Sequence, residues 1–166
     1  MQEEVILVNE NDEQMALMEK LEAHQKGLLH RAFSVFIFNS KNELLLQQRA
    51  LSKYHSAGLW TNTCCSHPRN GEETLAAAKR RLKEEMGIDC KIEFKSTFIY
   101  KADFDNGLIE HELDHIFTGT FSGEPITNPD EVEAYQWLSI DEIKKQMIAK
   151  PNNYTAWFKI AIEKFF

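Results

Sequence analysis

The segment Glu72–Met86 constrains the fold most, because it has the periodicity of one amphipathic helix. Apolar residues recur every three or four positions and fall on one helical face: Leu75, Ala78, Leu82 and Met86. Gly87 follows directly, and glycine is the residue that most readily ends a helix in the left-handed conformation. The sequence therefore predicts a helix over about 72–87 with one face in the core.

Strand patterns surround this helix, so the chain alternates between the two kinds of element. Segments rich in β-branched and aromatic residues predict strands at Phe33–Phe38, Leu44–Gln48, about Glu93–Asp103, Ile109–Phe121 and Ala134–Leu138. Ser139 and Glu142 have the spacing of a capping box, which predicts a helix reaching about Ala149. Tyr154–Phe165 predicts another helix, and Met15–His24 has a helical composition. These elements indicate a mixed α/β (α+β) domain.

Composition narrows the class of protein further. A chain of 166 residues with 43% apolar and 11% aromatic residues is expected to form one domain, residues 1–166, around one core. No apolar run reaches the roughly 18 residues of a membrane span, and the N-terminus has no signal-peptide pattern. Three cysteines, of which Cys64 and Cys65 are adjacent, make a poor disulfide framework, so we expect reduced thiols in the cytoplasm. A net charge of −7 argues against nucleic acid or an anionic membrane as the main partner.

Several chemically active side chains occur together in this small chain. Cys65 lies in the apolar, aromatic-flanked stretch Thr61–Pro68. Glu110 and Glu112 have strand spacing, which directs both carboxylates to one face. Three imidazoles accompany them: His24, His30 and His67. A thiol, imidazoles and paired carboxylates indicate a metal-assisted enzyme.

The remaining histidines and cysteines are expected to have structural roles. Strand alternation directs His111 and His115 to the face opposite the paired carboxylates, which excludes them as ligands of the same metal. The same alternation turns Cys64 away from its neighbour, so we expect Cys64 to pack in the core. Cys90 is expected to be structural as well, and His55 is expected to be a loop residue.

The central helix and its flanks resemble the Nudix motif, G-x5-E-x7-R-E-U-x-E-E-x-G-U. The matching residues are Glu72, Arg80, Glu84, Glu85, Gly87 and Ile88. Two positions differ, because Ser66 replaces the opening glycine and Arg81 replaces the glutamate after the arginine. The resemblance implies a single Nudix-fold domain, with a mixed β-sheet sandwiched between helices. In Nudix hydrolases the acids on this helix hold the Mg²⁺ ions used to cleave diphosphates, so Arg81 indicates other chemistry on the same scaffold.

The chain from about Val5 to Trp157 also resembles the type I isopentenyl-diphosphate isomerases of the Nudix superfamily. The matching motifs are Glu19-Lys20 with His24, then His30, Gln48–Lys53, Gly58–Asn62, Cys65, His67-Pro68, Arg80-Arg81, Tyr100, Glu110–Glu112 and Tyr135–Trp137. The resemblance implies an enzyme of isoprenoid biosynthesis that interconverts isopentenyl and dimethylallyl diphosphate. The reaction passes through a carbocation formed by protonation of the alkene and consumed by deprotonation.

The resemblance also implies roles for four catalytic residues. Glu112, assisted by Tyr100 and a metal ion, would protonate the terminal methylene, and Cys65 as thiolate would take the C2 proton. The reaction is reversible, so each group serves as both acid and base. Trp157 matches the family's tryptophan that faces the substrate, where its ring would stabilise the cation. The alternative is that Trp157 only packs its helix against the sheet.

Metal and diphosphate sites complete the expected machinery. Five residues are predicted to bind one metal ion: His24, His30, His67, Glu110 and Glu112. Such a set suits Mn²⁺ or Mg²⁺, and Zn²⁺ can also occupy it. The residues that match the family's anion-binding positions are Lys20, Arg49, Lys53 and Arg81. A second Mg²⁺ between Glu85 and the phosphates is implied, although Arg81 and Glu85 could instead form an ordinary solvated i,i+4 ion pair.

Two other functions stay open beside the isomerase. One is a Nudix hydrolase of a small diphosphate, which the partial motif favours and Arg81 disfavours. The other is a zinc-stabilised binding module on Cys64, Cys65 and His67, which lacks a second Cys/His pair with structural-zinc spacing. The expected partner is a small isoprenoid diphosphate, and the expected state is a monomer or weak homodimer.

Overall fold

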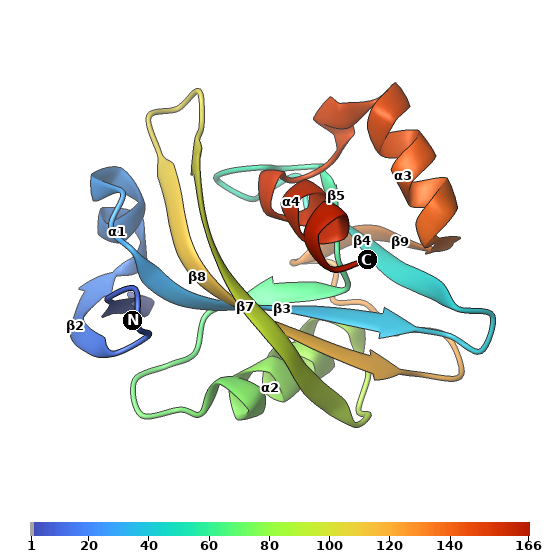
Figure 1. Ribbon diagram of the computed structural model, residues 1–166, viewed down its shortest axis with the longest axis horizontal. Helices are drawn as coiled ribbons and strands as arrows, with labels where there is room; N and C mark the ends of the chain where they lie inside the picture. Colours follow the sequence, from blue (N-terminus) through green and yellow to red (C-terminus); the bar gives the residue numbers. More distant parts are fainter. Residues whose placement is uncertain (1) are drawn as a thin grey trace.

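A nine-stranded mixed sheet with helices on both faces makes up the computed structural model, which describes residues 2–166 (Figure 1). The strands are β1 (Glu4–Val8), β2 (Gln14–Glu19), β3 (His30–Phe38), β4 (Glu43–Arg49), β5 (Trp60–Thr61), β6 (Cys64–Ser66), β7 (Ile92–Asp103), β8 (Ile109–Thr120) and β9 (Val132–Ser139). The helices are α1 (Lys20–Lys26), α2 (Thr74–Met86), α3 (Ile140–Ala149), the short 3₁₀ helix η1 (Pro151–Asn153) and α4 (Ala156–Phe165).

Strand β3 is the centre of the sheet. It pairs in parallel with β8, from His30 opposite Glu112 to Phe38 opposite Thr120. It pairs antiparallel with β1, β4 and β6, while β8 pairs antiparallel with β7. The sheet is therefore mixed, as predicted, and β3 connects the strands that carry the expected site residues.

Alternation along β3 and β4 divides the core between the two faces. Phe33, Val35 and Ile37 are fully buried against α2. Phe36 points to the opposite face, where it packs against Phe158 of α4. Burying each such side chain stabilises the fold by roughly 1.5–3 kcal/mol. Helix α2 lies on one side of the sheet and α3 and α4 on the other, which confirms a sheet between helices (Figure 1).

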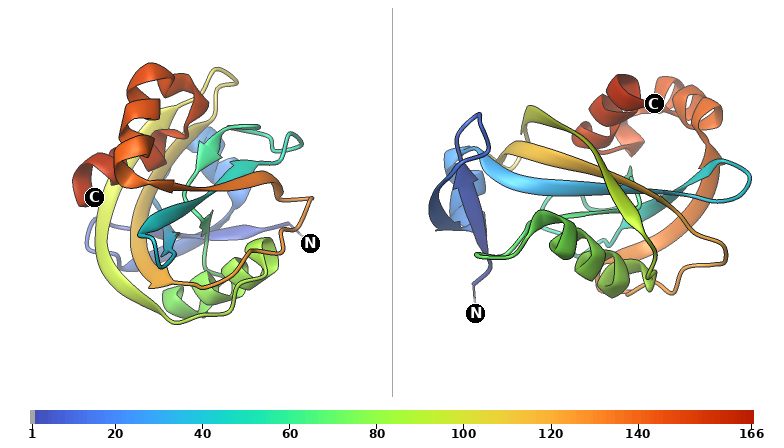
Figure 2. Two further views of the ribbon diagram at one scale, coloured as in Figure 1. Left: turned by 90° about the vertical axis from the view of Figure 1, so that its right-hand side faces the viewer. Right: turned by 60° about the horizontal axis from the view of Figure 1, so that its bottom comes forward.

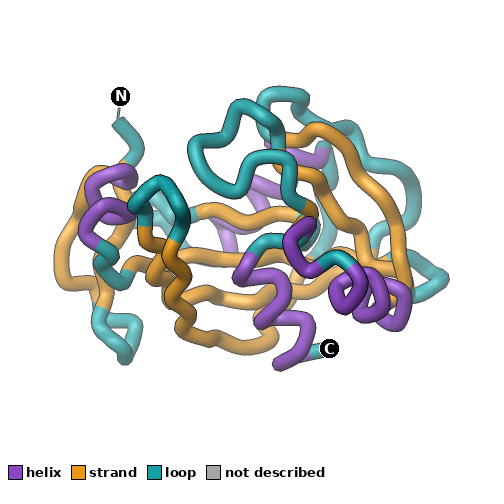
Figure 3. Tube along the Cα trace, turned by 90° about the horizontal axis from the view of Figure 1, so that it is seen from above, coloured by secondary structure: helices purple, strands orange, loops and turns teal. Residues whose placement is uncertain are grey.

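The N-terminal elements form one end of the molecule. Strands β1 and β2 and helix α1 gather there, while α3 and α4 lie toward the other end (Figures 2 and 3). Lys20 begins α1 directly after β2, and the Glu19 carboxylate accepts hydrogen bonds from the first backbone N–H groups of this helix. Helix α1 lies beside β8, so it can place a side chain next to the acids of that strand.

The predicted C-terminal end of α2 and the predicted N-terminal end of α3 are confirmed. Gly87 adopts the left-handed conformation after α2, with φ 65° and ψ 21°, and its N–H donates to the Lys83 carbonyl. A Cβ at this position would lie 2.7 Å from the Ile126 carbonyl oxygen, so only glycine fits without a shift. Ser139 Oγ accepts the Glu142 N–H at 3.2 Å, which is the serine half of the expected capping box.

The segment Met15–His24, which is helical in composition but ambiguous from the sequence, is a strand over its first half. Met15–Glu19 belongs to strand β2, which pairs with β1, and only the part from Lys20 onward is helical. Residues of good helix propensity form a strand here because β1 offers a partner for their backbone groups. Pairing of this kind overrides a weak local preference.

The helices and the cysteines bear on two expectations from the composition. Within residues 2–166 no helix is long and apolar enough to cross a membrane. Cys64, Cys65 and Cys90 are all free cysteines.

Candidate active site

A cleft of about 940 Å³ gathers side chains from both ends of the chain. Most of the predicted site residues line it: Lys20, Arg49, Lys53, Cys65, His67, Arg81, Glu85, Glu110, Glu112 and Trp157. The other three are His24, His30 and Tyr100. They are buried. His24 lies beside the Glu110 carboxyl, and His30 and Tyr100 contact the Glu112 carboxyl. The fold thus brings the whole predicted set together.

Strand register explains why these side chains meet. His30 on β3 and Tyr100 on β7 both stand opposite Glu112 on β8, so all three side chains point to one face. Ser34, four residues further along β3 and on the same face as His30, stands opposite Cys65 on β6. One face of the sheet therefore carries the thiol, the imidazole, the phenol and the carboxylate side by side.

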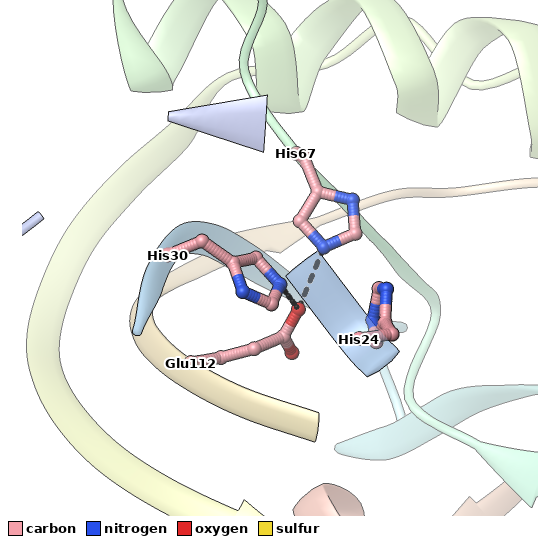
Figure 4. Close-up of side chains that lie close together, drawn as sticks. All are labelled: His24, His30, His67 and Glu112. Carbon is pink, nitrogen blue, oxygen red and sulfur yellow. Dashed lines mark hydrogen bonds and ion pairs between the residues drawn. The ribbon is translucent and has the colours of Figure 1, made fainter. Parts of the chain in front are cut away.

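Three imidazoles surround one carboxylate in what we call the histidine cluster: His24, His30, His67 and Glu112. Their ligand-capable atoms lie within 4.8 Å of one another. Nε2 of His30 and Nε2 of His67 point at the same oxygen, Glu112 Oε2, at 3.0 and 2.6 Å (Figure 4). Nitrogen and carboxylate atoms converging on one small volume are the donor set of a divalent transition-metal site.

The outer ring nitrogens support the same interpretation. His24 Nδ1 lies 2.7 Å from the Lys20 carbonyl oxygen, and His30 Nδ1 lies 2.9 Å from that of Leu28. A carbonyl can only accept, so Nδ1 carries the hydrogen and a neutral ring keeps its lone pair on Nε2. Within the described chain, the buried Nε2 of His24 has no hydrogen-bond partner. Metal-binding histidines have this arrangement, with the outer N–H held by a carbonyl, so these residues fit a divalent ion.

The five residues predicted for one metal site fall into two overlapping groups by the distances between their ligand-capable atoms. Glu110 does not belong to the histidine cluster but to a second group, with His24 and His55, whose ligand-capable atoms also lie within 4.8 Å of one another. His24 is common to both groups. His55 does lie in a loop, as expected, but it is 8% exposed and faces the site, which the sequence did not predict.

Burial keeps most of the imidazoles neutral. It lowers the pKa of His67 to about 4 and, together with the charge of Arg49, that of His55 to about 3. The pKa of His24 is also lowered, by burial and by neighbouring His30. For His30 burial acts in the same direction, but its hydrogen bond to Glu112 outweighs burial and raises the pKa. Neutral imidazoles retain the lone pair that a metal ion requires.

The paired carboxyls of β8 have opposite pKa shifts. Burial raises the pKa of Glu110 well above its ordinary value, and the charge of Glu112 adds to this. Burial acts on Glu112 in the same direction, but hydrogen bonds from His30 and His67 outweigh it and hold its pKa well below the ordinary value. Glu112 is therefore the more acidic carboxyl of the pair.

Two aromatic side chains lie near Glu112: Tyr100 contacts it, and Trp157 lies beside Tyr100. The Tyr100 hydroxyl donates to Glu112 Oε1. The Trp157 ring lies 6.4 Å from that of Tyr100, and the Arg49 guanidinium lies 5.5 Å from the Trp157 ring. Trp157 belongs to the core beneath α4 and also lines the cleft, so it is placed both to pack and to face a substrate.

The two adjacent cysteines point to opposite faces, as alternation predicted. Cys65 lines the cleft, and burial raises its pKa although Arg49 opposes this, so the resting group is a thiol. Cys64 is fully buried against α2, where its thiol donates to Glu85 Oε2 at 2.6 Å. Side chains on opposite faces cannot bind one ion together, which removes the basis of the zinc-stabilised module.

The predicted phosphate-binding residues are paired with acids or carbonyls around the cleft. Arg81 lies 3.2 Å from Glu85 and 3.2 Å from Glu131, and Lys53 also bonds Glu131. The Glu85 side chain is only 5% exposed, so its pair with Arg81 is not an ordinary solvated one. Lys20 pairs with Glu3 at 3.2 Å, and Arg49 donates to a loop carbonyl.

Three acidic or imidazole groups at the site were missed from the sequence. Asp114 is 1% exposed and accepts a hydrogen bond from Ser34 Oγ at 2.7 Å. The alternation that pairs the two glutamates of β8 extends to this residue, so the sequence did contain the signal. His55 and Glu131 lie in loops, where no periodicity indicates which way a side chain points.

The two histidines that the sequence excludes from the metal site bond groups outside the histidine cluster. His111 Nδ1 lies 3.1 Å from the Gly27 carbonyl oxygen. His115 lies 3.1 Å from the Ala32 carbonyl oxygen and 2.9 Å from Asp12 Oδ2. Neither belongs to a ligand group among residues 2–166.

Comparison with known proteins identifies the fold family. Residues 28–158 match the family described as NUDIX domain. A structure from Deinococcus radiodurans aligns with a TM-score of 0.77 at 18% identity, covering 99% of this chain and all of that one. A MutT NUDIX hydrolase from Burkholderia pseudomallei aligns with a TM-score of 0.65 at 24% identity, covering 83% of this chain and 98% of that one. These likenesses show the fold.

Curated relatives show which family of NUDIX-domain proteins the chain belongs to. An isopentenyl-diphosphate Delta-isomerase of Pectobacterium atrosepticum is 56% identical over 161 residues, which cover 97% of this chain and 90% of the relative. Isopentenyl-diphosphate Delta-isomerase 1 of Aromatoleum aromaticum is 50% identical, covering 99% of this chain and 93% of the relative. The chain therefore belongs to the isopentenyl-diphosphate Delta-isomerase family and is built on a NUDIX domain.

Proposed function

We propose that this enzyme interconverts isopentenyl diphosphate and dimethylallyl diphosphate by moving one proton onto the carbon skeleton and removing another. The observation that carries the proposal is the placement of Cys65 and the Glu112–Tyr100 pair on one face of the sheet, with Cys65 and Glu112 both lining one cleft. The names of the close relatives support the same reaction. Incubation with isopentenyl diphosphate and Mg²⁺, followed by measurement of the acid-labile allylic product, tests it.

The reaction requires four things of a site. An unactivated alkene is a poor base, so a strong acid has to be held against its terminal carbon. Protonation gives a tertiary cation at C3, which needs stabilisation and protection from water. A base then removes a C2 proton, and the double bond forms between C2 and C3.

Glu112 and Cys65 are the proposed proton-transfer groups. Tyr100 donates its hydroxyl hydrogen to Glu112, so a proton lost to the alkene from this carboxyl can be replaced through the phenol. Cys65 exchanges the C2 proton. The resting thiol and the ionised Glu112 are the states that act in the reverse direction, with the thiol donating and the carboxylate accepting. Forward isomerisation requires the opposite states, with Glu112 protonated and Cys65 as thiolate.

The metal centre is proposed to act on the carboxylate that donates the proton. His24, His30, His67, Glu110 and Glu112 would hold a divalent ion, Mn²⁺ or Mg²⁺ with Zn²⁺ as another occupant. Of these, Glu110 lies beside His24, with 3.9 Å between Oε1 and Nε2. When bound, such an ion withdraws electron density from its carboxylate ligand and makes the associated proton more acidic. A second ion, Mg²⁺, would be held by Glu85 and the phosphate oxygens, whose charge it would neutralise.

The diphosphate is proposed to bind where cations converge on the cleft: Lys20, Arg49, Lys53 and Arg81. Arg81 stands where the Nudix motif has a metal-binding glutamate, so the position contributes positive charge to the anion and not a ligand to a hydrolytic ion. This favours retention of the diphosphate over its cleavage. Hydrolysis of a small diphosphate remains the alternative, and measuring the phosphate released in the same incubation tests it.

The proposed cellular compartment and oligomeric state follow from the same chemistry. A mechanism that depends on the Cys65 thiol needs a reducing compartment, so we place the enzyme in the cytoplasm. One chain supplies all the lining residues described above, so a monomer or a weak homodimer is sufficient. The proposed partner is a small-molecule diphosphate, with no role for nucleic acid or a membrane.

Replacing Trp157 is expected to reduce the rate of the chemical step more than substrate binding. A desolvated cation–π contact contributes roughly 2 kcal/mol, which corresponds to about 30-fold in rate. Trp157→Ala should therefore lose about that factor or more in kcat, whereas Trp157→Phe should retain much of the activity. The measurement is kcat and KM for both variants, with the melting temperature of the same preparations. If Trp157 only packs α4, Trp157→Ala will lower the melting temperature and leave kcat of the folded fraction unchanged.

Replacing Arg81 is expected to weaken diphosphate binding. A hydrogen bond to a charged group contributes about 1.5–3 kcal/mol, so Arg81→Gln should raise KM about 10- to 100-fold. Lys83→Gln is the matched control, because it removes one positive charge from the exposed side of the same helix, α2. Steady-state kinetics at fixed ionic strength measures both. An unchanged KM for Arg81→Gln would remove Arg81 from the phosphate site.

A further inference from the structure

A second ligand group lies beside the histidine cluster. It consists of His24, His55 and Glu110, all buried, with ligand-capable atoms within 4.8 Å of one another. Two imidazoles and a carboxylate from three separate elements meet here: α1, the loop after β4, and strand β8. Only His24 is shared with the cluster of His30, His67 and Glu112.

His55 has a defined position, although it lies in a loop. Its ring stacks on Phe104 at 5.1 Å between centroids and meets Trp157 edge-on at 6.2 Å. The neighbouring Tyr54 carbonyl accepts a hydrogen bond from Asn106 Nδ2 at 3.1 Å, which ties the loop to the tip of the β7–β8 hairpin. The imidazole is thus held against His24, at 5.5 Å between ring centroids.

The group contains buried polar atoms that lack partners. Nε2 of His24 and Oε2 of Glu110 have no hydrogen-bond partner in residues 2–166. The distance from His24 Nε2 to Glu110 Oε1 is 3.9 Å, which is too long for a hydrogen bond. Buried polar groups are ordinarily satisfied, and a cation beside the free imidazole nitrogen and the carboxylate would satisfy both atoms.

We infer that His55 is a further ligand of the metal centre, acting with His24 and Glu110. His24 belongs to both groups and has one free ring nitrogen, so His55 and Glu110 would join the one ion bound to His24 and not form an independent site. A fourth imidazole raises the share of nitrogen donors. It therefore favours Co²⁺ or Zn²⁺ over Mg²⁺, which prefers oxygen ligands. The inference rests on the proposed metal centre but not on the isomerase reaction.

Co²⁺ titration of the metal-free protein tests this inference, with visible absorption as the readout. His55→Ala removes the imidazole, and His55→Phe removes the nitrogens but keeps a ring to stack on Phe104. Both variants should bind Co²⁺ about 10- to 100-fold more weakly, because even outer partners of metal ligands have effects of that size. Both should also change the Co²⁺ spectrum, whereas affinity for Mg²⁺ should change much less.

His111→Ala is the matched control, since it removes an imidazole next to Glu110 that faces away from the site. It should bind Co²⁺ as the unaltered chain does. Wild-type Co²⁺ affinity and spectrum in His55→Phe would overturn the inference and leave His55 as a packing residue. Absence of Co²⁺ binding by the unaltered chain would overturn both the metal centre and this inference. A chain that binds Co²⁺ through His55 but does not isomerise the substrate would contradict only the proposed function.

Discussion

Cys65→Ala and Glu112→Gln should each abolish isomerisation while leaving the protein folded. Each change removes one of the two groups proposed to exchange protons with the alkene, and loss of a general acid or base costs on the order of 10²–10⁴-fold or more. Glu112→Gln keeps the size of the side chain and an oxygen that can accept the Tyr100 hydrogen bond, so the fold should be retained. The rate of allylic product formation measures the effect, with circular dichroism as the check on folding.

Cys64→Ala is the matched control for the thiol. The two cysteines are adjacent, but the Cys64 side chain lies on the opposite face of the sheet, against α2. We expect the Cys64 variant to retain most of its activity, with a loss of stability from the vacated volume and from the lost hydrogen bond to Glu85. Comparable activity in Cys65→Ala and the unaltered chain would end the proposed mechanism.

His24→Ala, His30→Ala and His67→Ala should lower metal content and activity together. Each removes an imidazole from the histidine cluster, and loss of a direct ligand should weaken binding by at least the 10- to 100-fold reported for outer partners. Elemental analysis of the purified variants, alongside their activity, is the measurement.

His111→Ala and His115→Ala are the controls for the metal prediction. Both side chains bond backbone carbonyls away from the cleft, so metal content and activity should stay at the level of the unaltered chain. Full metal occupancy in the His67→Ala protein would mean that the histidine cluster is not the metal site.

The elements that could be predicted are those long enough for their own residues to show a helical or strand periodicity. The stripe on α2 and the β-rich runs of β3, β7 and β8 are each long enough to show their periodicity. Strand β2 was missed because its residues have a helical composition and its structure depends on pairing with β1.

The site could be predicted where its residues belong to strands or to a family motif. Alternation on β8 was sufficient to separate Glu112 from His111, and the same alternation would have identified Asp114. His55 and Glu131 could not be predicted, because a loop side chain acquires its direction from contacts made by the folded chain. For His55 the decisive contact is the stack on Phe104, which lies in a different loop.

The reaction itself is the most direct test of the central claim. The enzyme is incubated with isopentenyl diphosphate and Mg²⁺ in D₂O, and carbon-bound deuterium and free phosphate are measured in the same sample. Protonation of the alkene followed by removal of a C2 proton predicts dimethylallyl diphosphate with deuterium in a methyl group and the diphosphate intact. Released phosphate without the allylic isomer would contradict the account and establish the hydrolase instead.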